Sequence, residues 1–84
     1  MKYIASIDVM PLKTLLDPQG KAVNNVLKNN GYEEVTSVRI GKHITVEIEA
    51  VNKSEASDKI EKIASTVLIN PVIEEFTYTI EEKA

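Results

Sequence analysis

The sequence predicts a single α+β domain over residues 1–84, with the element order βαββαβ. Period-two alternation of apolar residues over residues 2–10, 34–40, 43–51 and 72–80 is typical of strands. Two segments with helical spacing separate the first strand from the second and the third from the fourth. Right-handed connections then predict a ferredoxin-like fold, a four-stranded antiparallel sheet with two helices on one face. The first and third strands are expected in the centre, and the second and fourth at the edges.

The first helix has clear start and stop signals. After the loop 11–16, Asp17 fits an N-cap and Pro18 fits the first helical position, where no backbone N–H is needed. Asn30-Gly31 fits a left-handed C-terminal cap. The stripe predicted to be buried consists of Ala22, Val23, Val26 and Leu27.

Gly20 is unusual because it lies in the first helical turn, where glycine costs about 0.5–1 kcal/mol relative to alanine. A glycine there permits close approach of another backbone, either of the same fold or of a partner. The sequence alone also allows a neutral glycine, and the cost does not decide between these readings.

The second half of the chain repeats the strand–helix–strand order. Gly41-Lys42 is predicted to form a tight hairpin turn between two strands. The second helix begins near Ser54, or near Asn52 with Glu55 completing a capping box, and Asn70-Pro71 ends it. The tail 81–84 is expected to be frayed. The core positions predicted on the strands include Tyr3, Ala5, Ile7, Val9, Val38, Ile40, Ile44, Val46, Ile48, Ala50, Val72, Phe76, Tyr78 and Ile80.

Composition excludes several function classes. The chain has no cysteine, which rules out disulfides, thiolate nucleophiles and Cys-ligated metals. Its formal net charge is −3 and no basic run exists, so nucleic-acid binding is not expected. No membrane-spanning stretch and no signal-peptide pattern is present, and we expect a cytoplasmic location.

No set of residues predicts catalysis, a cofactor or a metal ion. His43 is the only histidine and is interpreted as a surface residue, because one imidazole supplies neither a triad nor a metal site. Asp8, Glu47 and Glu49 share the open face of the sheet, where a solvated or partner-facing acidic patch is the better interpretation. The same carboxylates would repel RNA. The loop after the first strand has no glycine or arginine, unlike a phosphate-binding loop.

Three segments, taken together, resemble one known family. They are Leu16-Asp17-Pro18-Gln19-Gly20-Lys21-Ala22-Val23, Val38-Arg39-Ile40-Gly41-Lys42-His43-Ile44 and Leu68-Ile69-Asn70-Pro71-Val72-Ile73-Glu74-Glu75-Phe76. In order and spacing they are similar to the PurS family, and the resemblance covers nearly the whole chain. One departure is the loop 11–16, which is slightly shorter than in the family and lacks its usual glycine.

The resemblance implies a non-catalytic accessory subunit of phosphoribosylformylglycinamidine (FGAM) synthase, an ATP-dependent ligase of purine biosynthesis. Such a subunit bridges a PurL-like synthetase, which would carry ATP and Mg²⁺, and a PurQ-like glutaminase. The resemblance also implies self-association to a dimer or tetramer. The partner-contact residues that it suggests are Asp17, Gln19, Gly20, Arg39, Lys42 and Asn70.

Two other functions stay open from the sequence. One is a small-molecule regulatory domain of the ACT-like type, which calorimetric titration with amino acids would reveal. The other is a small stand-alone enzyme, which assays with ATP and glutamine would reveal. Self-association has a separate indication in Thr77-Tyr78-Thr79-Ile80, a predicted edge strand without proline or charge that invites pairing with a second copy.

Overall fold

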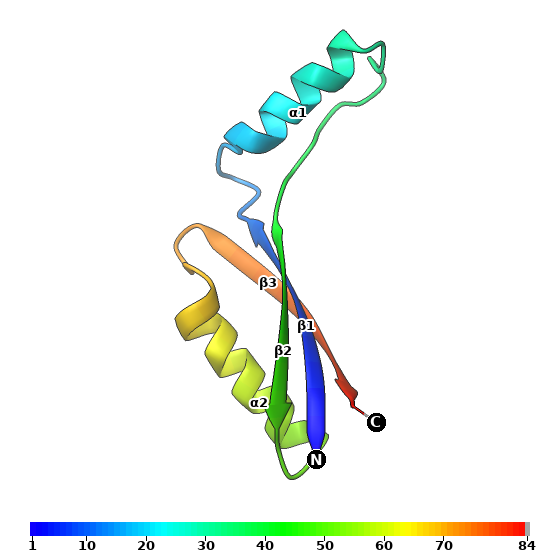
Figure 1. The fold of residues 1–84 in the computed structure, drawn as a ribbon. Helices are drawn as coiled ribbons and strands as arrows, with labels where there is room; N and C mark the ends of the chain where they lie inside the picture. Colours follow the sequence, from blue (N-terminus) through cyan, green and yellow to red (C-terminus); the bar gives the residue numbers. More distant parts are fainter. Residues whose placement is uncertain (84) are drawn as a thin grey trace.

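The computed structural model describes residues 1–83 and shows an α+β fold with two α-helices and a three-stranded antiparallel sheet (Figure 1). β1 lies in the centre and pairs with β2 on one side and β3 on the other. The elements in chain order are β1 (Lys2–Pro11), α1 (Pro18–Asn29), β2 (Lys42–Glu49), α2 (Lys53–Ile63), the π-helical turn η1 (Ala64–Leu68) and β3 (Glu74–Glu82).

The core lies between one face of the sheet and α2. The face predicted for the first strand is buried, with Ile7 fully enclosed and paired across the sheet with Ile44 and Tyr78. On α2, Ile60 is equally enclosed. The buried residues are Tyr3, Ala5, Ile7, Val9, Ala50, Ala56, Ile60, Ala64 and Ile80.

The expected strand over residues 34–40 does not form in this chain, so the prediction of a four-stranded sheet within one chain is wrong. A two-residue hairpin at Gly41-Lys42 would need left-handed backbone, yet Gly31 is the only residue of the described chain with such a φ, at 92°. The chain instead runs from residue 34 through Gly41 directly into β2 (Figure 1). Gly41 is required for another reason, because a Cβ there would lie 2.3 Å from the Val9 carbonyl oxygen.

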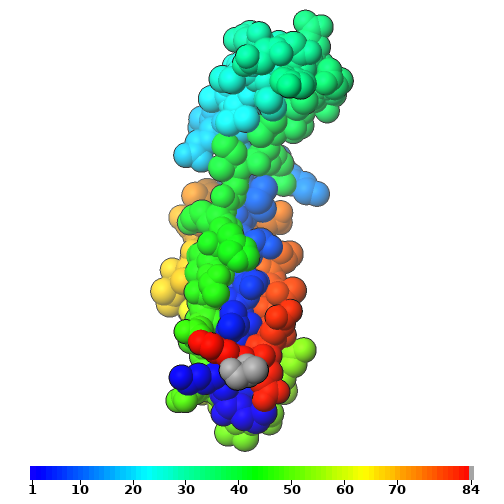
Figure 2. All heavy atoms as spheres, turned by 45° about the vertical axis from the view of Figure 1, so that its right-hand side comes forward, coloured from blue at the N-terminus to red at the C-terminus, as the bar shows by residue number. Residues whose placement is uncertain are grey.

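The prediction that two helices cover one face of the sheet is also wrong for the single chain. α2 covers the sheet, whereas α1 projects beyond its end (Figure 1). We call residues 18–40, which extend the molecule beyond the sheet in Figure 2, the projection. The principal extents are 51 × 29 × 14 Å and the radius of gyration is 16.5 Å, compared with about 12 Å for a compact chain of this length. Two residues predicted to be buried, Val23 and Val26, are 40% and 57% exposed.

The strand predicted over residues 72–80 begins two residues later, at Glu74, and Val72, which was predicted to be in the core, is 76% exposed. Other boundaries follow the sequence more closely. Asp17 is the N-cap of α1, as predicted, and Asn52, one of the two starts considered for the second helix, is the N-cap of α2. Gly31 adopts the left-handed conformation after α1. The predicted frayed tail is partly ordered, because Glu81 and Glu82 belong to β3, whereas Ala84 lies outside the described residues. Among residues 1–83, no helix is long and apolar enough to cross a membrane.

Candidate functional site

The residues suggested for partner contact gather where α1 leaves the sheet, a region that we call the junction. It consists of the loop 11–20, residues 38–42 and the turn 70–74. The turn is tied to the loop by a hydrogen bond from the Leu12 N–H to the Ile73 carbonyl oxygen, 2.9 Å long. Three segments that are distant in sequence therefore meet at one end of the sheet.

Asp17 connects the two backbone segments that join the projection to the sheet, one before α1 and one before β2. Its carboxylate accepts hydrogen bonds from the backbone N–H groups of Gly20 and Ile40, each 2.9 Å long. The Gly20 bond caps α1, and the Ile40 bond fixes the chain just before β2. These bonds, that of Gly20 first, lower the pKa of Asp17 below its ordinary value of 3.8.

Gly20 and Arg39 tighten the same connection. A Cβ at Gly20 would lie 2.1 Å from the Val38 carbonyl oxygen, so the close approach that this glycine permits is within the chain. The Arg39 guanidinium donates a hydrogen bond to the Pro11 carbonyl oxygen at the end of β1. The junction therefore holds the projection at a defined angle to the sheet.

Lys42 and Asn70 meet through Glu74, a residue that the sequence did not single out. One Glu74 carboxylate oxygen accepts from the Asn70 N–H at 2.9 Å, and the other lies 3.4 Å from the Lys42 ammonium nitrogen. The Asn70 bond, with a smaller contribution from Lys42, lowers the pKa of Glu74. The Asn70 side chain accepts from the Val72 N–H at 3.1 Å and shapes the turn. Gln19 is exposed and shares a cavity of about 290 Å³ with Lys42 and Glu74.

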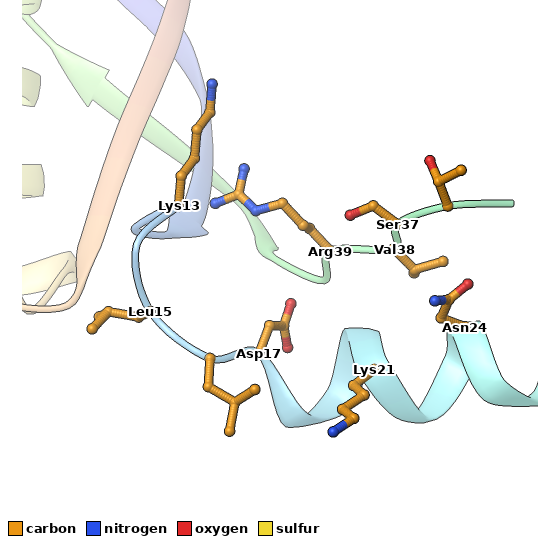
Figure 3. Close-up of a pocket in the computed structure, with 10 residues that line it drawn as sticks. Lys13, Leu15, Asp17, Lys21, Asn24, Ser37, Val38 and Arg39 are labelled. Carbon is orange, nitrogen blue, oxygen red and sulfur yellow. The ribbon is translucent and has the colours of Figure 1, made fainter.

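A second cavity, of about 300 Å³, lies between α1 and residues 36–39. Its polar side chains do not converge on one point, because Lys13 and Lys21 extend in opposite directions from Asp17 (Figure 3). Among residues 1–83, no group of three or more His, Cys, Asp or Glu side chains is placed to hold a metal ion. The geometry of the cavity therefore suits a surface for contact better than a reaction chamber.

Two carboxylates on the open face of the sheet, those of Asp8 and Glu47, are paired with cationic or ring nitrogen atoms of other segments. Nδ1 of His43 lies 2.7 Å from an Asp8 carboxylate oxygen, and both side chains are more than half exposed. Glu47 accepts a hydrogen bond from Lys83, which lowers the Glu47 pKa. Carboxylates that are exposed and paired in this way are solvated surface groups rather than a general acid and base.

Comparison with known proteins places this architecture in a family. The family model PurS, described as phosphoribosylformylglycinamidine (FGAM) synthase, matches residues 4–82. The chain belongs to the PurS family. A PurS subunit of this synthase from Thermotoga maritima is 37% identical over 71 residues, which span 84% of the chain and 87% of that subunit.

Solved PurS structures share the whole shape, including the projection. Thermus thermophilus PurS is 35% identical, and the alignment covers 100% of both chains with a TM-score of 0.88. A chain in the structure of PurLQS from Thermotoga maritima is 32% identical, with 96% of this chain and 99% of that chain covered and a TM-score of 0.87. The resemblance drawn from the sequence is confirmed, and the chain is a PurS subunit of FGAM synthase, an enzyme of purine biosynthesis.

The role of Asp17 in the junction is testable by replacing it with asparagine. An amide has one acceptor oxygen and would turn its NH₂ donors towards the Gly20 or Ile40 N–H, so Asp17→Asn is expected to lower stability at about pH 7. Because the Asp17 pKa is lowered, its stabilisation is complete above the unfolded-state pKa and is lost as the pH falls through the folded-state pKa. Urea denaturation across this pH range should show the difference between the two proteins vanishing in acid.

The matched control is Asp58→Asn, which changes an exposed carboxylate on α2 and should leave stability unchanged throughout. Equal stability of the Asp17→Asn and unsubstituted proteins at neutral pH would mean that the junction does not depend on this carboxylate.

Proposed function

We propose that this PurS chain is a non-catalytic accessory subunit that bridges the synthetase and glutaminase subunits of FGAM synthase, so that ammonia released from glutamine reaches the synthetase. The observation that carries the proposal is membership of the PurS family in a chain whose polar residues do not converge on a reaction site. A similar chain in PurLQS from Thermotoga maritima supports PurL-like and PurQ-like partners. The chain then acts in the cytoplasm and needs no cofactor of its own, while ATP and Mg²⁺ belong to the synthetase.

Self-association by exchange of the projection is the second part of the proposal. α2 lies over the β1 and β3 side of the sheet, and the β2 side of that face lacks a helix. The residues left there, Ile44, Val46 and Ile48, are only partly buried. The α1 of a second copy has the missing apolar surface in Val23 and Val26. If that α1 packed on the β2 side, each sheet would have two helices on one face.

The free edge of β2 offers the place for a fourth strand. Met1 and Ala50 lie opposite each other and form two backbone hydrogen bonds, of 3.2 and 3.0 Å. Because backbone groups alternate in direction along a strand, those of Ile48, Val46 and Ile44 also point to β1. The backbone groups of His43, Thr45 and Glu47 therefore point outwards. Residues 34–40 of a second copy continue the alternation of β2 and fit this edge as an antiparallel strand. Two copies related by a twofold axis near Gly41 would each complete the other's four-stranded sheet.

The junction explains why α1 would pack on the sheet of a second copy rather than fold back onto the sheet of its own chain. The Asp17 and Arg39 hydrogen bonds hold the projection away from its own sheet, and no hairpin turn occurs at Gly41 to reverse the chain. The agreement in shape with Thermus thermophilus PurS over the whole of both chains supports a projection that belongs to the fold.

Reconstitution of the synthetase and glutaminase subunits from the same organism tests the bridging role. Without this chain, glutamine-driven FGAM formation is expected to fall by about tenfold or more, because tethering replaces a bimolecular encounter between the enzymes. Synthesis supplied with high ammonium should change much less, because it needs no transfer between subunits.

The chain alone serves as a control and should hydrolyse neither glutamine nor ATP. Equal glutamine-driven rates with and without the chain would refute the bridging role, and turnover that purifies with the 9.3 kDa chain would refute catalytic silence.

A further inference from the structure

The outer edge of β3 is the second unpaired edge of the sheet, and exchange of the projection does not cover it. In the part of the chain that the structure describes, β1 is the only strand beside β3. The Lys83 N–H donates to the Lys2 carbonyl oxygen at 2.8 Å, so this pair faces inwards and every second residue along β3 does the same. The backbone N–H and C=O groups of Phe76, Tyr78 and Ile80 therefore point away from the sheet.

The two ends of this edge are acidic and its middle is uncharged. Glu74 and Glu75 begin β3, Glu81 and Glu82 end it, and residues 76–80 carry no charge. Lys42 pairs with Glu74. Within residues 1–83, the other three carboxylates form no ion pair, and all three residues are exposed. A strand that pairs with β3 would thus meet negative charge at both ends.

A second copy of the chain is a poor occupant of this edge. Antiparallel pairing of two β3 strands about Tyr78 sets Glu75 opposite Glu81 and Glu74 opposite Glu82, and directly opposed like charges destabilise a sheet. The sequence of Thr77–Ile80 suggested an edge that pairs with another copy. Such pairing is therefore better placed at the edge of β2 than at the edge of β3.

We propose that the β3 edge binds an extended segment of a protein partner, with β-branched or apolar residues at its centre and lysine or arginine at both ends. Main-chain hydrogen bonds to Phe76, Tyr78 and Ile80 supply the affinity, and the three unpaired carboxylates of Glu75, Glu81 and Glu82 select the cationic ends. This inference rests on the proposed bridging function, because it assigns one partner subunit of the synthase to this edge.

Amide hydrogen exchange measured by NMR provides the sharpest test, because an added strand would protect only every second amide of β3. In the isolated protein, the amides of Phe76, Tyr78 and Ile80 should exchange quickly, whereas those of Thr77 and Thr79 are already protected by β1. In the complex with the synthetase and glutaminase subunits, the first three should slow by about a hundredfold or more. Unchanged exchange at these three amides in an intact complex would overturn the edge site.

Charge reversal tests the selection of a cationic segment. Glu75→Lys, Glu81→Lys and Glu82→Lys combined should weaken assembly by about tenfold or more at low salt, with a smaller effect at high salt. The matched control reverses Glu33, Asp58 and Glu61, which are exposed elsewhere, and should assemble normally. Sedimentation of each protein alone separates the occupants, since a loss of the dimer in the β3 variant would assign the edge to a second copy.

The same experiments distinguish this inference from the function on which it rests. Normal assembly of both charge-reversal proteins would refute the edge site and leave the bridging role intact. Failure of the unsubstituted chain to join either subunit would refute both.

Discussion

Val26→Glu is expected to convert the protein from a dimer into a folded monomer. Val26 is 57% exposed on α1 in the single chain, so a glutamate there costs the isolated chain little. In the exchanged dimer the same side chain would be buried against the apolar β2 side of a partner sheet, and an unpaired buried carboxylate costs several kcal/mol. Sedimentation velocity should show at least about a hundredfold weaker self-association.

Asn25→Glu is the matched control for this change. Asn25 is the preceding residue on the same helix, is exposed, and lies outside the apolar stripe. Its replacement adds the same charge to α1 and should leave the dimer intact, while far-ultraviolet circular dichroism should be the same for all three proteins. A Val26→Glu protein that remains a dimer at micromolar concentration would exclude α1 from the interface.

Gly20→Leu is expected to destabilise the junction itself, by about 3 kcal/mol or more. The Cβ of any side chain at Gly20 would lie 2.1 Å from the Val38 carbonyl oxygen and 2.8 Å from an Asp17 carboxylate oxygen. The first contact is with backbone, so relief requires α1 and residues 38–40 to separate, which breaks the Asp17 bond to Ile40. Urea denaturation measures the loss, and self-association should weaken with it because the projection no longer has a fixed direction.

Asn25→Leu places the same side chain at an exposed position of α1 and should change stability by less than about 0.5 kcal/mol. If Gly20→Leu instead kept full stability and weakened only the assembly with partner subunits, the role of Gly20 would be contact with a partner rather than close packing within the chain.

The sequence predicted the elements that local chemistry determines. The N-cap Asp17, the left-handed Gly31 and the buried face of β1 follow from residue type and spacing alone, whereas the structure decided between Asn52 and Ser54 as the start of α2. The placement of α1 and residues 34–40 could not be predicted, because an apolar stripe is the same whether its own chain or another one covers it. Gly41 was equally ambiguous, since glycine serves both tight turns and close approaches.

The candidate site was found only in part, for a related reason. The resemblance to PurS suggested six residues, and they do meet at the junction. Their partners include the Gly20 and Ile40 N–H groups and the Pro11 carbonyl oxygen, and such backbone groups have no signature in a sequence. A hydrogen bond between Glu74 and Asn70 could have been suspected because the two residues are four positions apart. The alternation of apolar residues instead assigned Glu74 to a strand.

The exchange proposed for α1 would make the stability of this chain depend on its own concentration. A chain of 84 residues that leaves Val23 and Val26 in water would gain part of its hydrophobic stabilisation only when α1 packs on another copy. Its melting temperature therefore rises with protein concentration by mass action, and dilution alone favours unfolding. In the exchanged dimer proposed above, the stability of a newly made PurS chain would therefore grow with the logarithm of its own concentration in the cell, which would couple the abundance of the subunit to its survival.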